Sequence, residues 1–90
     1  MGANWTIRFY RSARRELRSI QDEDLKEEII QAILALVENP HPGDSVKLEG
    51  HHRLYRIRIG SWRVVYSLSE DEKTVLITRV RHRQNAYAGL

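Results

Sequence analysis

The sequence contains no cysteine, which excludes disulfide bonds and thiolate metal sites. It also lacks a long apolar run, since the stretch Ile33–Val37 is far shorter than the roughly 20 residues of a membrane-spanning helix. No pattern typical of a secretion signal precedes the first alternating segment. These absences favour a cytoplasmic protein with no membrane partner, because a reducing compartment fits the missing cysteines.

What the chain does contain is a mild surplus of positive charge on a composition typical of a folded domain. Lysine and arginine number 15 against 12 acidic residues, and 41% of the residues are hydrophobic, too many for a disordered tail. A chain of 90 residues can bury one modest core but not two. We therefore expect one domain spanning residues 1–90, whose partners depend on where the positive charge is placed.

The stretch Tyr55–Tyr66 predicts a β-hairpin. Gly60 and Ser61 form a two-residue turn signal, with glycine where a type II′ turn needs a positive φ. Polar and apolar residues alternate on both sides, and this pattern predicts two strands in a register that pairs Arg58 with Arg63. The other face of the hairpin is then apolar and suited to cover a core. Its residues are Tyr55, Ile57, Ile59, Trp62, Val64 and Tyr66.

Two further segments have the pattern of strands. Trp5, Ile7 and Phe9 alternate with polar residues and predict a first strand. Thr74–Val80 is almost continuously apolar in its middle, as in a strand covered on both faces. Because it follows the hairpin after a polar turn, we expect it to complete an antiparallel meander of three strands. The place of the first strand in the sheet stays open.

Apolar residues at helical spacing predict two helices between the first strand and the hairpin. Ser12 is the predicted N-cap of the first helix, and Asp22 or Asp24 that of the second. Pro40 ends the second helix, because the residue before a proline avoids the α region. The predicted fold is a two-layer α+β domain in the order strand, helix, helix and three strands. Both helices pack on one face of a small, mainly antiparallel sheet and leave a basic face open.

The open face gathers Arg56, Arg58 and Arg63, and like charges directly opposite each other destabilise a sheet. An anionic ligand is the simplest reason for such a cluster, since forked guanidinium groups suit phosphate. A strand's arginines most often form only its solvated face, but three in one tight hairpin favour a site. At least one of Arg81 and Arg83, at the end of the last strand, should reach the same surface.

Titratable groups stand beside these cations, because His82 and Tyr87 follow the last strand. Cations that stabilise a pentacoordinate phosphate and groups that transfer protons are the parts of a phosphodiester-cleaving site. No acidic cluster is predicted near it, so a metal is not implied, and cleavage without metal favours RNA with its internal 2′-OH nucleophile. Other basic residues are predicted to be solvated, with a secondary chance of touching the RNA backbone or the ribosome. They are Arg14, Arg15 and Arg18 of the first helix, and Lys47.

Three motifs resemble the RelE branch of the RelE/ParE toxin superfamily. They are Lys47-Leu48-x-Gly50, the hairpin Tyr55–Tyr66, and His82-Arg83-x-x-x-Tyr87. The resemblance covers essentially the whole chain, and the ending favours RelE-like over ParE-like members. It implies a toxin of a type II toxin–antitoxin system with a RelE-like fold. Such a toxin is a ribosome-dependent endoribonuclease that cuts mRNA in the A site without metal or cofactor.

The resemblance also implies roles for particular residues. Arg63 and Arg83 would stabilise the phosphate charge, and one of Arg56, Arg58 and Tyr87 would assist proton transfer. The best-known members have lysines where this chain has Arg56 and Arg58. A guanidinium stays protonated and is a poor base, so a purely electrostatic role suits both arginines equally well. That leaves Tyr87 or His82 as proton-transfer candidates, with Arg81 as a further cation.

The partners implied by the resemblance are the ribosome, its mRNA and a cognate RelB-like antitoxin, which with the toxin could form a heterotetramer. An antitoxin segment laid over the arginines should be acidic. Two other functions stay open from the sequence. One is a ParE-like inhibitor of DNA gyrase that acts by protein binding, and the other is a non-catalytic nucleic-acid-binding domain.

Overall fold

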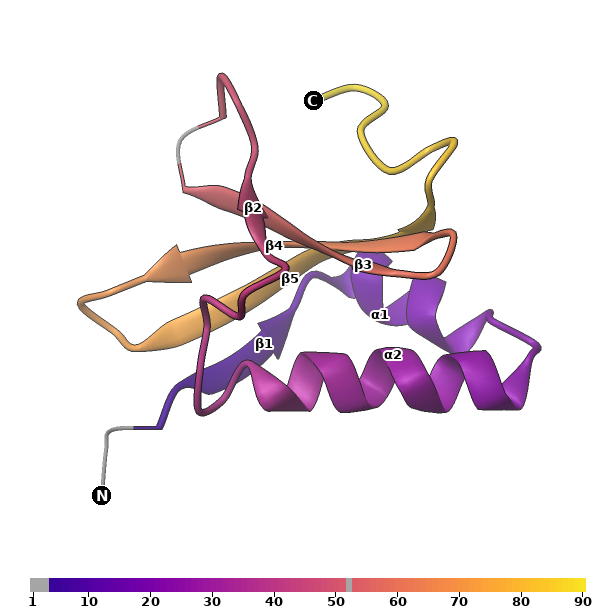
Figure 1. Cartoon of the computed structure of the whole chain (residues 1–90), viewed down its shortest axis with the longest axis horizontal. Helices are drawn as coiled ribbons and strands as arrows, with labels where there is room; N and C mark the ends of the chain where they lie inside the picture. The colour runs from indigo at the N-terminus through magenta and orange to yellow at the C-terminus, as the bar shows by residue number, and fades with distance from the viewer. Residues whose placement is uncertain (1–3, 52) are drawn as a thin grey trace.

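The computed structural model describes residues 4–51 and 53–90, which form one sheet with two helices against one of its faces (Figure 1). In chain order the elements are β1 (Thr6–Phe9), α1 (Arg11–Arg18), α2 (Glu23–Ala35), β2 (Val46–Lys47), β3 (Leu54–Ile59), β4 (Trp62–Ser69) and β5 (Thr74–His82). Within the described residues, neither helix has the length and apolarity to cross a membrane.

The sheet has the strand order β1-β5-β4-β3-β2. β1 is parallel to β5, and the remaining neighbours are antiparallel, so the sheet is mixed. Figure 1 shows α1 and α2 below the sheet and the C-terminal segment above it. The predicted two-layer α+β fold is confirmed, and the first strand takes its place at the edge beside β5.

The hairpin forms in the predicted register, with Arg58 paired with Arg63 and Ile59 with Trp62. Gly60 has a φ of 59°, and Ser61 has no positive φ, as a type II′ turn requires. The predicted apolar face belongs to the core between sheet and helices or packs against it. Among the largest fully buried side chains of this core are Tyr66, Ile29, Leu36, Ile77 and Val64.

The helix starts differ from the prediction in one case. α1 begins at Arg11 after Tyr10, with no side-chain cap, so Ser12 as N-cap is wrong. The Tyr10 N–H still donates to the Ile77 carbonyl (2.9 Å), which keeps residue 10 extended and lets the helix start directly after it. For α2 the prediction of Asp22 is confirmed, because its carboxylate accepts from the Leu25 N–H (3.1 Å).

Three features of the sheet were not predicted. β2 has two exposed residues at the edge, too few to show an alternation. β5 runs two residues further than Val80, and its pairing with β4 has a register shift between Val65 and Tyr66. The face opposite the helices is also less open than expected. Ala86 of the C-terminal segment and Val65 of β4 are fully buried, yet neither belongs to the core on the helix side.

Candidate functional site

Three arginines lie side by side on the sheet face opposite the helices. Arg58 of β3 is the register partner of Arg63 of β4, and Arg63 is the partner of Arg81 of β5. We call these three residues the arginine row and their side of the sheet the arginine face. Neighbouring strands are roughly 4.8 Å apart, so the row concentrates three positive charges in a narrow band. The sequence predicted the first pair and expected Arg81 or Arg83 on the same surface, and the structure places Arg81 in the row.

The hairpin turn holds the middle member of the row. Arg63 Nη1 donates to the carbonyls of Gly60 (3.0 Å) and Trp62 (2.9 Å). These two bonds use one nitrogen of the guanidinium, and its other donors have no hydrogen-bond partner among the described residues. Arg63 is therefore oriented by its own turn and can still bind an anion.

A carboxylate from α1 holds the end of the row. Glu16 Oε2 accepts from Arg81 Nε at 2.6 Å, and Glu16 Oε1 accepts from the Val80 N–H at 2.9 Å. β1 pairs with β5 only as far as Ile77, and α1 continues along the edge beyond it. Glu16 therefore replaces a strand partner for β5 and orients Arg81 at the same time. The sequence reasoning missed Glu16, although it is the one acidic residue among four arginines of α1.

A second line crosses the same face one step along the strands, from Arg56 through Val65 to Arg79. Arg79 Nη1 donates to the carbonyls of Ala86 (3.1 Å) and Ala88 (2.6 Å). Burial lowers the pKa of the Arg79 guanidinium, and the nearby charge of Arg81 lowers it further. Arg79 alternates with Arg81 in the sequence, which would have placed it on this face, but its bonds to the tail could not be foreseen.

The C-terminal segment, residues 83–90, brings the other predicted site residues to this side, and we call it the tail. The Arg83 N–H donates to the Ser61 carbonyl (2.7 Å), which puts Arg83 next to the hairpin turn. Tyr87 is 41% exposed. It lines a cavity of about 210 Å³ together with residues of the β2–β3 loop and the end of the chain, namely Leu48, Glu49, His51 and Leu90.

Two predicted residues are not brought together with the arginine row. His82 is the partner of Trp62, and their rings meet edge to face with centroids 6.0 Å apart. Since neighbours along a strand point to opposite faces, His82 lies on the other side of the sheet from Arg81. Lys47 is the partner of Tyr55 on the edge strand, and Tyr55 packs against the core on the helix side.

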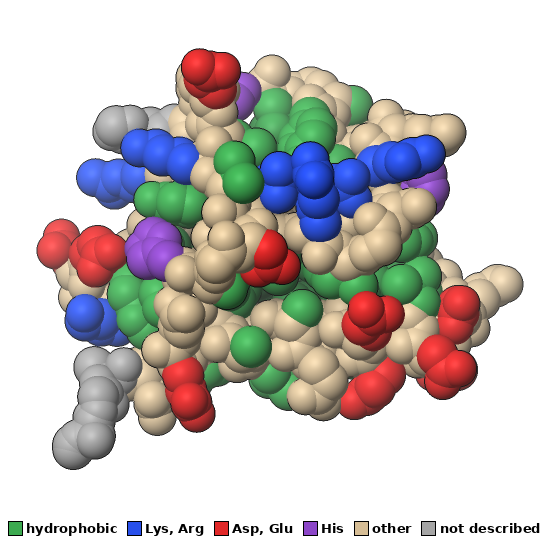
Figure 2. Space-filling view, in the orientation of Figure 1, with side chains coloured by type: hydrophobic (Ala, Val, Ile, Leu, Met, Phe, Trp, Pro, Cys, Tyr) green, Lys and Arg blue, Asp and Glu red, His purple; other side chains and the backbone are tan. Residues whose placement is uncertain are grey.

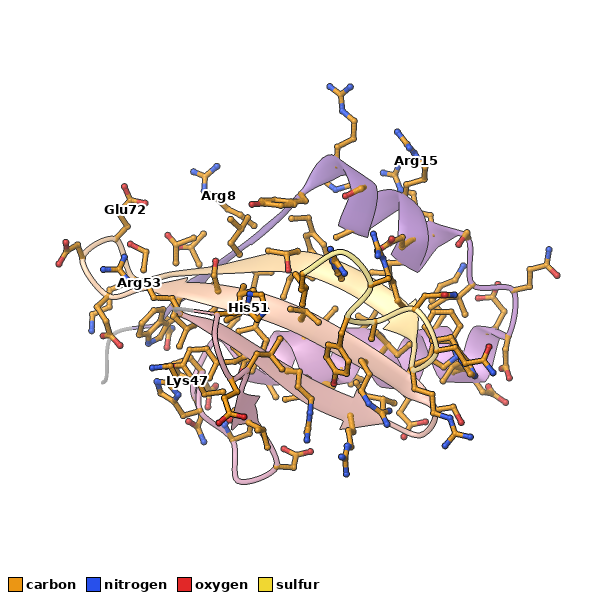
Figure 3. The ribbon with its side chains drawn as sticks, turned by 90° about the horizontal axis from the view of Figure 1, so that it is seen from above. Arg8, Arg15, Lys47, His51, Arg53 and Glu72 are labelled. Carbon is orange, nitrogen blue, oxygen red and sulfur yellow. The ribbon has the colours of Figure 1, made fainter. Side chains whose placement is uncertain are left out.

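The arginines of α1 form a separate basic surface. Arg14, Arg15 and Arg18 are all exposed, and the Arg14 guanidinium lies over the Phe9 ring, 5.7 Å from its centroid. In Figure 3, which looks down on the arginine face, Arg15 points away from the sheet on the far side of α1. A ligand that contacts both these residues and the arginine row must therefore be larger than one phosphate, as RNA or the ribosome is.

The sheet and α2 differ in charge. Figure 2 shows basic side chains across the part of the molecule over the sheet and several acidic ones along the opposite side, where α2 runs. The acidic residues of α2 are exposed, namely Glu23, Asp24, Glu27 and Glu28. An anionic ligand is therefore drawn to the sheet rather than to α2.

Comparison with known proteins identifies the class of protein to which this sheet and its cationic outer face belong. The family model for the ParE toxin of type II toxin–antitoxin systems matches residues 7–87. The chain therefore belongs to this family of toxins, and it is RelE-like. The relative named RelE1 from Methanocaldococcus jannaschii is 28% identical over an alignment of 86 positions, which covers 92% of this chain and 94% of that protein.

Solved structures support the same assignment. The RelE–RelB complex of Pyrococcus horikoshii matches with a TM-score of 0.78 and 26% identity, covering 92% of this chain and 99% of that one. The RelBE2 toxin–antitoxin complex of Mycobacterium tuberculosis matches with a TM-score of 0.75 and 25% identity, covering 89% and 99%. The isolated Escherichia coli RelE toxin shares the fold. It matches with a TM-score of 0.76 and 21% identity, covering 87% of this chain and 83% of that one.

Proposed function

We propose that the protein is a ribosome-dependent endoribonuclease that cuts mRNA in the A site and so inhibits translation. The observation that carries this proposal is the arginine row, three guanidinium groups in register on one sheet face. Arg83 stands beside the same hairpin turn, and Tyr87 belongs to the tail, which lies on the same side of the sheet (Figure 1). This set combines charge for a phosphate with a group that can transfer a proton.

In the proposed reaction, the 2′-oxygen of one nucleotide attacks the adjacent phosphorus. A bond from the 2′-oxygen to phosphorus forms as the bond to the 5′-oxygen of the next nucleotide breaks, leaving a 2′,3′-cyclic phosphate and a 5′-hydroxyl. One proton leaves the 2′-oxygen and one reaches the 5′-oxygen. The nucleophile is internal to RNA and the arginines supply the positive charge, so the reaction as proposed uses no metal and no cofactor.

The roles that we propose for these groups rest on the family resemblance and on the chemistry of each side chain. Arg63 and Arg83 stabilise the phosphate in the transition state, while Arg56 and Arg58 contribute electrostatically because guanidinium groups do not give up protons near neutral pH. Tyr87 is the proposed proton-transfer group. Arg81 supplies further positive charge at the end of the row.

The test is cleavage of a defined mRNA on programmed ribosomes, with 5′ ends mapped, and the same mRNA without ribosomes. The wild type should cut within translated codons only when ribosomes are present. Replacement Arg63→Ala should lower the rate by roughly 10²- to 10³-fold, the usual effect of removing one transition-state donor. Arg8→Gln is the matched control, because Arg8 is exposed on β1 and lies apart from the site in Figure 3. Binding to free RNA without any cleavage would instead support a non-catalytic nucleic-acid-binding domain.

A second candidate function is inhibition of DNA gyrase by protein binding, which the match to the ParE family favours. It does not need the arginine row or Tyr87. Supercoiling by purified gyrase in the presence of wild-type protein and of Arg63→Ala separates the two. Inhibition that persists in Arg63→Ala, without mRNA cleavage by the wild type, would replace the ribonuclease proposal.

The proposed partners are the ribosome, its mRNA and a RelB-like antitoxin, and the proposed location is the cytoplasm, where translation occurs. The antitoxin is supported by the similarity to toxins solved in complex with RelB. We expect the antitoxin to lay an acidic segment over the arginine face, with toxin and antitoxin together in a heterotetramer. Co-expression with the neighbouring reading frame, followed by purification and light scattering, tests both statements.

A further inference from the structure

One arginine of the arginine face, Arg79, binds the main chain of the tail. Both bonds of Arg79 go to main-chain carbonyls of the tail, Ala86 at 3.1 Å and Ala88 at 2.6 Å, and both come from the same nitrogen, Nη1. A terminal guanidinium nitrogen has two N–H donors, so this nitrogen is fully used. Arg79 therefore differs from Arg56 at the other end of its line, for which the described residues offer no hydrogen-bond partner.

The two carbonyls belong to the residues on either side of Tyr87. Holding both of them fixes the peptide groups Ala86–Tyr87 and Ala88–Gly89, so the main chain of Tyr87 lies between two fixed groups. The methyl group of Ala86 is fully buried, which anchors the same segment by packing. A third contact comes from Arg81, whose Nη1 lies 3.5 Å from the Asn85 carbonyl.

The tail has little other structure to hold it. Its own hydrogen bonds are turns, such as the Leu90 N–H to the Tyr87 carbonyl (3.2 Å) and the Ala88 N–H to the Asn85 carbonyl (3.4 Å). Such exposed single turns are weak in isolation. The short bond from Arg79 to Ala88 joins the tail to β5, which lies between β1 and β4 in the sheet.

We propose that Arg79 is a positioning residue for Tyr87, because its guanidinium clamps the main chain on both sides of Tyr87 and fixes that phenol on the arginine face. The consequence for catalysis rests on the proposed ribonuclease function, while the clamp itself does not. A proton-transfer group must be held closely in place, and a displacement of about 1 Å can lower a rate by roughly 10²-fold. Arg79 thus acts through Tyr87 and not on the phosphate.

The first experiment needs no RNA. Amide hydrogen exchange of the full chain is measured by mass spectrometry for the wild type, Arg79→Gln, Arg79→Lys and the control Arg8→Gln. Residues 85–90 should exchange faster in Arg79→Gln, while the α2 peptides should not change. Arg79→Lys should keep slow exchange, since an ammonium group has three donors and retains the charge. Unchanged tail exchange in Arg79→Gln would overturn the clamp, and Arg79→Lys decides the matter if Arg79→Gln fails to fold.

The second experiment is a double-mutant cycle of cleavage on programmed ribosomes. Arg79→Gln should lower kcat by roughly 10- to 100-fold with KM unchanged, and it should have no further effect in a Tyr87→Phe background. If Arg79→Gln instead raises KM and makes RNA binding less dependent on salt concentration, Arg79 is a phosphate ligand and the proposal is overturned. Additive effects of Arg79→Gln and Tyr87→Phe on kcat would also overturn it. If the wild type does not cleave at all, the proposed function fails, and the exchange data alone decide whether Arg79 holds Tyr87.

Discussion

Replacing Glu16 should destabilise the protein more than its place on a surface helix suggests. The carboxylate accepts from the Val80 N–H (2.9 Å) and from Arg81 Nε (2.6 Å), so Glu16→Ala removes two partners from β5 at once. A main-chain N–H left without an acceptor in a partly buried site costs about 1–3 kcal/mol. The side chains of the ion pair are only 29% and 25% exposed, and we assign it at most about 1 kcal/mol.

Together these contributions give a loss of about 1–4 kcal/mol for Glu16→Ala, with a midpoint of about 2.5 kcal/mol. Because 1 kcal/mol shifts the Tm of a domain of this size by roughly 4–8 °C, the expected decrease is on the order of 10–20 °C. Glu16→Gln keeps one carbonyl oxygen as an acceptor and should lose about half as much. Urea unfolding followed by the fluorescence of Trp5 and Trp62, together with thermal melts by circular dichroism, measures both variants.

The matched control is Glu28→Ala, which removes an exposed carboxylate from α2 and should change stability by no more than about 0.5 kcal/mol. Hydrogen exchange adds a local readout, because the Val80 amide should exchange faster in Glu16→Ala. If Glu16→Ala and Glu28→Ala are equally stable, the carboxylate does not complete the edge of β5. The account of how Arg81 is oriented would then fail as well.

Three further predictions concern the fold. Burial raises the pKa of Tyr66 to about 12, so this phenol ionises in the unfolded chain at a lower pH than in the folded protein. The free energy of unfolding, measured by urea titration, should therefore fall as the pH rises from about 10 to 12. Tyr66→Phe should lack the part of this decrease that Tyr66 causes. Gly60→Ala should cost about 1–2 kcal/mol of stability in thermal melts, because residue 60 has a φ of 59°. No atom crowds an added Cβ at Gly60 or at Gly43, but Gly43 has no positive φ, so Gly43→Ala should leave stability unchanged. Asp22→Ala should cost about 1 kcal/mol by loss of the N-cap bond, and Ser12→Ala, which removes no cap, should not destabilise the protein in the same melts.

The hairpin could be predicted in full because its signals are local. A period of two and a two-residue turn together define the register, so the pairing of Arg58 with Arg63 follows from sequence spacing alone. The same reasoning failed for β2, where two residues cannot show a period, and for Ser12, because a long-range bond from Tyr10 to Ile77 decides where α1 begins.

The parts of the site that could not be predicted depend on contacts between distant segments. Glu16 meets Arg81 across a separation of 65 residues, and no periodicity connects them. The tail has no alternation that would indicate that it folds over the sheet, so the burial of Ala86 and the role of Arg79 could be read only from the structure. Sequence patterns thus placed the arginines on a face but could not say which of them are already bound.

That difference decides where a phosphate should enter. On β5 both arginines have partners, Arg81 in Glu16 and Arg79 in the tail, and on β4 the turn holds one nitrogen of Arg63. On β3, Arg56 and Arg58 have no hydrogen-bond or ion-pair partner among the described residues. Positive charge without compensation therefore increases from β5 towards β3. An anion is attracted most strongly where the positive charge is least compensated, so we expect the phosphate to approach over β3. Arg63 of β4 is then the next arginine it meets, and the tail held by Arg79 borders the site on the β5 side.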